Sequence, residues 1–329
     1  MADAVETMAW TNEVPWHGLG HKVDGNLSPK QMLKAAKLDW SVSLRSLRAG
    51  DSHNALVHNT EVKEFFALVR DSDETVFDVV GSRWKPTQNE EAFEFFNEFV
   101  HAGGATMETA GSLHGGRMVW GLANMQRAFK LKGGDEVKGY LLMALPHEQG
   151  KSIRAMLTMV RVVCNNTLTQ ALRDGVGDGF RMSHRRVFDA LQQETAKRTL
   201  GIAREDFDVQ KEIAEKLAGT TLVREDALKL LAELIEPSLL RSEVGLEELL
   251  ASNKVPKDYR LCALSLDKAP GQQLSSATGT LWGVVNAVTY AADHLFGKMP
   301  DRRLSKAWFG TAAKLKSDAV RLALKKAGK

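Results

Sequence analysis

The stretch A-T-M-E-T-A-G-S-L-H-G-G-R-M-V-W-G-L-A (105–123) decides the fold, because it predicts a β-hairpin. Strands are expected at 105–113 and 117–123, and the glycines of H-G-G between them suit the positive φ angles of a hairpin turn. A further pair of strands is predicted at 139–145 and 152–164, joined across P-H-E-Q-G-K. Sequential hairpins imply an antiparallel sheet.

The preceding residues predict more strands and one long helix. Residues 40–48 alternate apolar and polar side chains, and a hairpin is expected at 65–81, around the polar turn D-S-D-E. Thr87 and Glu90 have the spacing of a capping box that begins a helix, and Gly103-Gly104 ends it. The apolar side chains expected to pack this helix onto the sheet are Phe93, Phe96, Phe99 and Val100.

After about residue 187 the pattern becomes helical. Helices are predicted at 187–217, 222–236, 238–251, 280–296 and 305–326, with connections at 254–260 and 268–273. We therefore predict an α+β fold, an antiparallel sheet of hairpins with a packed helix, followed by a mostly helical C-terminal region. The expected division is residues 1–186 for the sheet and residues 187–329 for the helical region, packed on the first.

Composition favours a cytoplasmic protein without a membrane span. The 329 residues are 43% hydrophobic and include only two cysteines, Cys164 and Cys262, too few for a disulfide framework or a four-thiolate zinc site. No secretory signal and no run of eighteen apolar residues is present in the sequence.

The net charge is only +3, but it is unevenly distributed. Residues 151–186 carry seven Lys or Arg against two acids, residues 302–329 carry nine against one, and residues 205–250 are rich in Glu and Asp. Basic patches suit a polyanion partner, although they are also typical of solvated helix faces. The cations expected to face outward on the last helix are Lys314, Lys316, Arg321, Lys325 and Lys326.

Catalytic and cofactor signatures are missing from the sequence. Q-G-K-S (149–152) lacks the glycine of a phosphate-binding loop, because Leu145 stands there, and a hairpin turn is the preferred interpretation. His17 and His21 lie in a glycine-rich arm that argues against a zinc site. We expect no metal, no cofactor and no nucleotide hydrolysis. A metal-dependent nuclease would depend on carboxylates such as Asp78 and Glu108.

Three basic segments are candidate nucleic-acid contacts. In R-W-K-P (83–86), Trp84 could stack on a base while Arg83 and Lys85 hold phosphates, or it could close the core. In H-G-G-R (114–117), Arg117 could end an anion cradle, or the glycines could simply form a turn. R-M-S-H-R-R (181–186) is either a polyanion contact or a solvated linker. Its basic residues are Arg181, Arg185 and Arg186.

The stretch V-R-V-V-C-N-N-T-L (160–168) holds the last candidate. Cys164 ends an apolar strand and is expected to be a structural, buried thiol. Asn165 or Asn166 is predicted to cap a helix beginning near Thr167. Arg161 is then a charge in an apolar strand, expected to face solvent or to meet a carboxylate or a phosphate.

Several motifs together resemble a known family. P-W-H-G-L-G (15–20), R-W-K-P-T-Q-N-E-E-A-F-E-F-F (83–96), E-T-A-G-S-L-H-G-G-R-M-V-W (108–120), V-R-V-V-C-N-N-T-L (160–168), G-T-L-W-G-V-V-N-A-V-T-Y (279–290) and W-F-G-T-A-A-K-L-K (308–316) are similar to the phage/plasmid-like proteins. That is a domain-of-unknown-function family of phages, plasmids and bacterial mobile elements. The resemblance spans nearly the whole chain and implies a context of nucleic-acid metabolism in mobile elements.

The leading hypothesis is therefore a protein that binds DNA, with single-stranded DNA favoured. One version is a single-strand annealing or recombination-mediator protein, which would form a homo-oligomer and hydrolyse no nucleotide. Phage annealing proteins likewise combine an antiparallel sheet with packed helices, an analogy of fold. The alternatives are a metal-dependent nuclease and a phage factor that binds a host protein through its acidic stretch 205–250.

Overall fold

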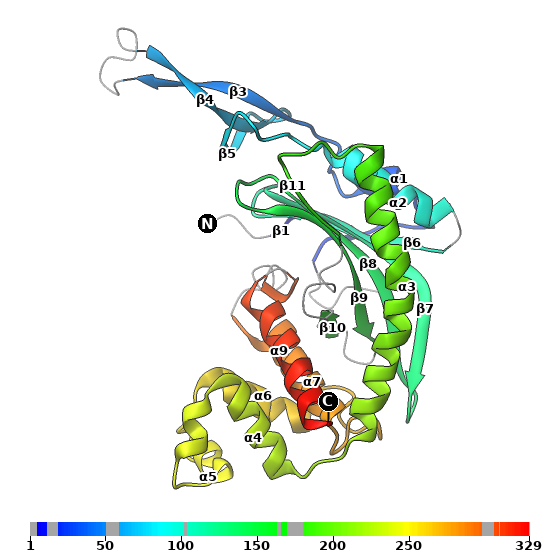
Figure 1. The fold of residues 1–329 in the computed structure, drawn as a ribbon, viewed down its shortest axis with the longest axis vertical. Coiled ribbons are helices and arrows are strands. Elements are labelled where there is room, and N and C mark those ends of the chain that lie inside the picture. Colours follow the sequence, from blue (N-terminus) through cyan, green and yellow to red (C-terminus); the bar gives the residue numbers. More distant parts are fainter. Residues whose placement is uncertain are drawn as a thin grey trace.

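The structure is a computed structural model that describes residues 5–11, 19–50, 59–101, 104–162, 166–169, 180–297, 306–308 and 310–328. Figure 1 shows a three-stranded sheet at one end of the molecule, a large curved sheet in the middle and the C-terminal helices at the other end. An antiparallel-rich sheet is thus followed by a helical C-terminal region. The predicted α+β fold is confirmed.

Hairpins consecutive in sequence build the large sheet. Its strand order is β10-β9-β8-β7-β6-β1-β2, and β11 pairs with β9 as well. Every pairing is antiparallel except the parallel contact of β1 with β2. The strands are β1 (Val5–Trp10), β2 (His21–Lys22), β6 (Thr106–Leu113), β7 (Met118–Leu131), β8 (Asp135–Pro146), β9 (Ser152–Arg161), β10 (Asn166–Thr169) and β11 (Phe180–Ser183).

Alternation along these strands gives the sheet two different faces. One packs against α1 (Pro29–Ala35), α2 (Asn89–His101) and α3 (Ala190–Gly219) and belongs to the main core. Gly121 on this face is required by packing, since a Cβ there would lie 2.9 Å from the ring of Phe96. The opposite face holds Trp120, whose ring meets that of Trp308 edge-on at 4.9 Å.

The start of α2 differs from the prediction by one residue. Gln88 precedes the first helical residue, and its backbone N–H donates to the Glu91 carboxylate at 2.8 Å. Within the described residues the buried Thr87 hydroxyl has no hydrogen-bond partner, and Glu90 pairs with Lys30, so the predicted capping pair of Thr87 and Glu90 is wrong. The expected packing of Phe93 and Phe96 is confirmed, whereas the side chain of Phe99 lies outside the described residues.

The predicted helix near Thr167 is also wrong. Asn166–Thr169 form β10, which pairs antiparallel with the end of β9, so that Asn166 lies opposite Arg161. The partner strand supplies backbone hydrogen bonds that a helix would have made internally. Cys164 and Asn165 lie outside the described residues.

The small sheet is an arm built from β3 (Val42–Gly50), β4 (Asn59–Arg70) and β5 (Thr75–Gly81), paired in that order. Arg70 fastens its base to the large sheet. The guanidinium donates to Glu6 at 2.7 Å and to Asp73 at 2.6 Å, and it lies over the ring of Trp40 at 5.3 Å. These contacts connect β4 to β1 across more than sixty residues of sequence.

The H-G-G turn packs directly on this anchor. Gly116 has φ +87°, and a Cβ there would lie 2.8 Å from a guanidinium nitrogen of Arg70 and 3.0 Å from the ring of Phe77. Gly115 has φ +66° with open space around its Cβ position. The turn is therefore a structural element of the arm's base.

Replacing Gly116 by Ala should lower the free energy of unfolding by about 2 kcal/mol or more, since both a left-handed conformation and a steric clash are introduced. Gly115→Ala is the matched control, because it introduces only the left-handed conformation and no steric clash. It should lower the free energy of unfolding by about 1 kcal/mol. Urea unfolding of both variants measures the difference. Equal losses would contradict the packing role of Gly116.

The C-terminal helices share a continuous core with the large sheet. They are α4 (Arg224–Ile235), η1 (Pro237–Arg241), α5 (Leu246–Ala251), α6 (Lys257–Lys268), α7 (Leu281–Tyr290), η2 (Ala291–Leu295) and α9 (Thr311–Lys326). The single helix predicted at 238–251 is broken, because Ser242 and Gly245 adopt extended backbone conformations. The predicted connection at 254–260 contains the first turn of α6, which starts after Pro256, a residue suited to helix starts.

A buried ion pair corrects the predicted outer face of the last helix. Lys316 is 1% exposed, and its ammonium lies 2.8 Å from a carboxylate oxygen of Asp293, which is 0% exposed. Besides Lys316, the buried residues of α9 are Leu324 and three alanines, Ala312, Ala319 and Ala323, whose small side chains leave space for the lysine. Burial lowers the pKa of Lys316, and the Asp293 carboxylate opposes this shift.

Candidate nucleic-acid interface

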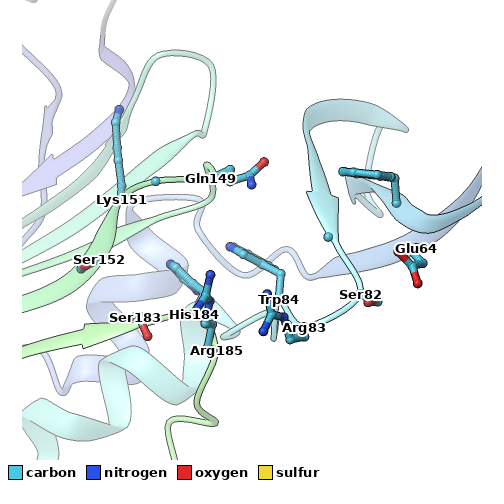
Figure 2. A pocket seen from close by; sticks show the side chains of 13 residues that line it. Glu64, Ser82, Arg83, Trp84, Gln149, Lys151, Ser152, Ser183, His184 and Arg185 are labelled. Carbon is cyan, nitrogen blue, oxygen red and sulfur yellow. The ribbon is translucent and has the colours of Figure 1, made fainter.

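A cavity of about 490 Å³ lies where the arm meets the large sheet. Three segments distant in sequence line it, namely the arm's base, the β8–β9 turn and the end of β11 (Figure 2). The volume falls within the range of ligand sites in proteins. The lining residues used below are Glu64, Arg83, Trp84, Lys151, His184 and Arg185.

Trp84 and His184 hold the arm against β11. Their rings stack at 4.3 Å with an interplanar angle of 17°, and the two side chains lie next to each other in Figure 2. The backbone N–H of Lys85 donates to the carbonyl of His184 at 2.5 Å. These two contacts fix the segment around Trp84 to the segment around His184. Arg83 and Arg185, the neighbours of these residues in sequence, consequently line the same cavity.

The cavity carries an excess of positive charge. Arg83, Lys151 and Arg185 line it together with a single acid, Glu64, so three cations face one anion. Lys151 has an ion pair with Glu148, outside the lining. Arg83 and Arg185 are both exposed, and neither has an ion pair with any residue that the structure describes. Two guanidinium groups are thus available to an anionic ligand, and guanidinium suits phosphate geometry.

Glu64 occupies an unusual backbone position in the cavity wall. It has φ +69°, and the pairing of β4 with β3 shifts between Phe66 and Val62, which marks a bulge. The carbonyl of Glu64 accepts from the backbone N–H of Ser82 at 2.9 Å. Bulges of this kind redirect a side chain and are frequent beside functional sites. Here the hydrogen bond from Ser82 connects the bulge in the middle of β4 to the segment that carries Arg83.

The structure brings together six of the eight predicted contact residues. Arg83, Trp84 and Arg185 line the cavity, and the side chains of the other three, Lys85, Arg181 and Arg186, are exposed on the segments that border it. Arg117 stands apart, since its Nε donates to the carbonyl of Phe77 at 2.9 Å. The side chain of Arg161 lies outside the described residues.

Trp84 acts in the wall rather than as an open platform. It is 7% exposed and packs in a small core with Val42, Leu68, Phe77 and Val80. His184 covers one face of its ring. Trp84 therefore has the environment expected if it closes the core, which was one of the two predicted roles. A base could stack on the ring face that His184 covers only if His184 moved.

Lys151 is a basic residue of the cavity lining that was not among the predicted contacts. The Q-G-K-S stretch is the β8–β9 hairpin turn, as the missing loop glycine suggested, and Gly150 has φ +80°. The backbone N–H of Gln149 donates to Asp78 at 2.7 Å, which fastens the turn to β5 of the arm. A lysine in a turn that follows a buried strand was the available signal, but only the fold places it in the lining of the same cavity as Arg83.

Two buried histidines form the junction beneath the cavity. His147 is fully buried, and its Nε2 lies 2.9 Å from Oδ1 of Asn89. Because the Asn89 amide nitrogen donates to the carbonyls of Leu38 and Trp40, its Oδ1 must accept, and the proton of His147 must be on Nε2. Burial lowers the pKa of His147 to about 3.

His184 is kept neutral in the same way. It is 2% exposed, and burial lowers its pKa to about 4, against the opposing effect of the Lys85 and Pro146 carbonyls. A neutral imidazole stacks on Trp84 without placing a charge in the core. The positive charge of the cavity at pH 7 therefore comes from its arginines and lysine.

Acidification below pH 6.5 should destabilise the protein. The unfolded chain takes up a proton at His184 near pH 6.5, whereas the folded chain does so only near pH 4, so the free energy of unfolding falls between these values. The loss attributable to His184 is about 3 kcal/mol. Urea unfolding from pH 7 to pH 4.5 measures the total loss, to which His147 adds because burial lowers its pKa as well. Comparison with a variant lacking His184 gives the part due to His184.

His184→Phe keeps an aromatic ring on Trp84 and removes the titration, so its stability should depend less on pH in this range. His21→Phe, at an exposed position on β2, is the control and should retain the full dependence. An unchanged slope in His184→Phe would show that folding does not lower the pKa of His184.

The two carboxylates on which a nuclease would depend, Asp78 and Glu108, have structural partners. Glu108 accepts from Asn124 at 3.1 Å and from Tyr140 at 3.2 Å, while Asp78 accepts from the Gln149 backbone. Within the described residues, no three His, Cys, Asp or Glu side chains come together as a metal site. His21 is exposed, and His17 lies outside the described residues. Among the helices of the described ranges, none has the length and apolarity to span a bilayer.

Residues 76–309 match the family described as Domain of unknown function (DUF932). The chain belongs to this family. The DUF932 match begins on β5 and ends at the segment after η2, so it contains every residue of the cavity except Glu64 and Phe65 of β4. No curated protein and no solved structure matches the chain significantly.

Proposed function

We propose that this protein binds nucleic acid, with single-stranded DNA favoured, through the cavity at the base of the arm. The observation that carries the proposal is the convergence of Arg83 and Arg185, two arginines without ion-pair partners in the described structure. Phosphates bound by cations release counterions, which supplies much of the affinity of such proteins.

The shape of the site favours a flexible strand over a duplex. Its cations lie in a cavity at a junction of segments, where a single strand can bend in, whereas a recognition helix for a major groove would present them on a convex surface. Lys85, Arg181 and Arg186 are exposed on the segments that also carry cavity residues, and they add positive charge to these segments. This arrangement supports backbone binding without base readout.

A role in phages or other mobile elements follows from the motif resemblance and fits this activity. The protein would act in the cytoplasm of a bacterial host as an annealing or recombination-mediator protein, assembled as a homo-oligomer. Binding of nucleic acid is the part of the proposal that can be tested directly, because it depends on residues that can be substituted one by one.

Fluorescence polarisation with a labelled oligothymidylate tests the proposal directly. Affinity should fall steeply as salt rises from about 50 to 200 mM, with a slope of about −0.7 for each phosphate neutralised on a single strand. A labelled duplex of the same length gives the strand preference. Absence of binding at low salt would refute the function.

A further inference from the structure

A second, smaller cavity of about 200 Å³ borders the first. Lys151 and Ser152 line both, so the two cavities meet at the β8–β9 turn. The remaining lining residues of the second cavity are His114, Met118, Ala144, Arg154, Lys306 and Gly310. Lys306 belongs to the segment before α9, which brings a cation from the far end of the chain to the sheet.

The second cavity is basic as well. Lys151, Arg154 and Lys306 line it, and the described residues contribute no Asp or Glu to its wall. In the register of β9 with β11, Ser183 lies opposite Ser152 and Arg181 lies opposite Arg154. Both arginines therefore add positive charge to the same pair of strands.

Strand geometry arranges these side chains in a line. Ser152 and Arg154 are two residues apart on β9, so they point to the same face of the sheet, as do Ser183 and Arg181 on β11. Arg185 follows at the end of β11, in the first cavity. Cations therefore continue from Arg185 past Lys151 to Arg154 and Lys306.

We infer that the second cavity is a second phosphate subsite for the same ligand, which is consequently an oligonucleotide spanning both cavities and not a mononucleotide. The inference rests on the proposed function and extends it to three residues outside the predicted contacts, Lys151, Arg154 and Lys306. A strand entering at Arg83 and Arg185 leaves along the β9–β11 face toward Lys306.

Oligothymidylates of two lengths test this path, one of roughly 3 nucleotides and one of roughly 12. The Arg154→Gln/Lys306→Gln variant should bind the long strand about 10-fold more weakly, with a salt slope shallower by about 1.4, and bind the short strand like the wild type. Arg83→Gln/Arg185→Gln should weaken both. Lys306→Gln alone tests the same path with a substitution at an exposed position. Thermal unfolding verifies that each variant is folded.

Unchanged affinity of Arg154→Gln/Lys306→Gln for the long strand would overturn the second subsite while leaving the proposed function intact. Failure of the wild type to bind either strand would refute the proposed function itself. Displacement of the long strand by an equal charge of polyglutamate would show that any flexible polyanion suffices, and would overturn the oligonucleotide path. Lys254→Gln, exposed beyond α5, is the control for loss of one charge.

Discussion

Reversing both cavity arginines, in an Arg83→Glu/Arg185→Glu variant, should lower the affinity for oligothymidylate about 100-fold at low salt, or about 2.8 kcal/mol. The cavity would then hold three acids and one lysine in place of three cations and one acid. Phosphates would be repelled where they were attracted, and the salt dependence should become shallow. Polarisation titrations at several salt concentrations measure both quantities.

Two further variants separate the charge of the cavity from the charge of the chain. Arg241→Glu/Lys254→Glu makes the same change in net charge at exposed sites in the helical region. Its affinity for oligothymidylate should fall by less than about 3-fold. Glu64→Gln removes the one acid of the lining and should bind more tightly. If the helical-region control lost as much affinity as the cavity variant, binding would reflect net charge and not this site.

Replacing Lys316 by Met should destabilise the protein by about 3–5 kcal/mol, because it leaves the carboxylate of Asp293 buried without its lysine. Both groups of this pair are almost completely shielded from water, which separates it from the surface pairs of the same helix, such as Arg321 with Asp318. Chemical denaturation of the variant gives the loss.

The double variant Lys316→Met/Asp293→Leu removes both charges and should recover most of the lost stability, since apolar pairs of similar volume often replace buried ion pairs without loss. Lys325→Met is the control on the exposed side of α9 and should change stability by less than about 0.5 kcal/mol. A loss in Lys316→Met no larger than in this control would mean that the ammonium is not needed to neutralise Asp293.

The local patterns that the sequence predicted well are those in which neighbouring residues set the structure. Alternation and turn residues located the hairpins predicted at 65–81, 105–123 and 139–164, the last of which has its second strand, β9, end at Arg161. The glycines and polar turns that specify hairpins act over a few residues. The phenylalanine spacing of α2 likewise placed Phe93 and Phe96 against the sheet. The α+β class followed from the order of these elements.

Errors arose where a distant segment determined the outcome. Asn166 is a good capping residue by itself, but pairing with β9 makes it part of a strand. Lys316 belongs to a basic run, but Asp293 on another helix provides the partner that permits its burial. Arg117 was predicted as an anion ligand, but its Nε donates to the carbonyl of Phe77 on β5.

The sequence by itself determined the hairpins, the helical second half and the basic character of 83–85 and 181–186, since composition and periodicity are local properties. Only the tertiary structure decided which of those cations share a site. The stacking of Trp84 on His184 brings Arg83 and Arg185 to one cavity, and the β8–β9 turn adds Lys151. Cations separated by a hundred residues can act on the same anion only after packing brings them to one cavity, because electrostatic interactions depend on distance in space.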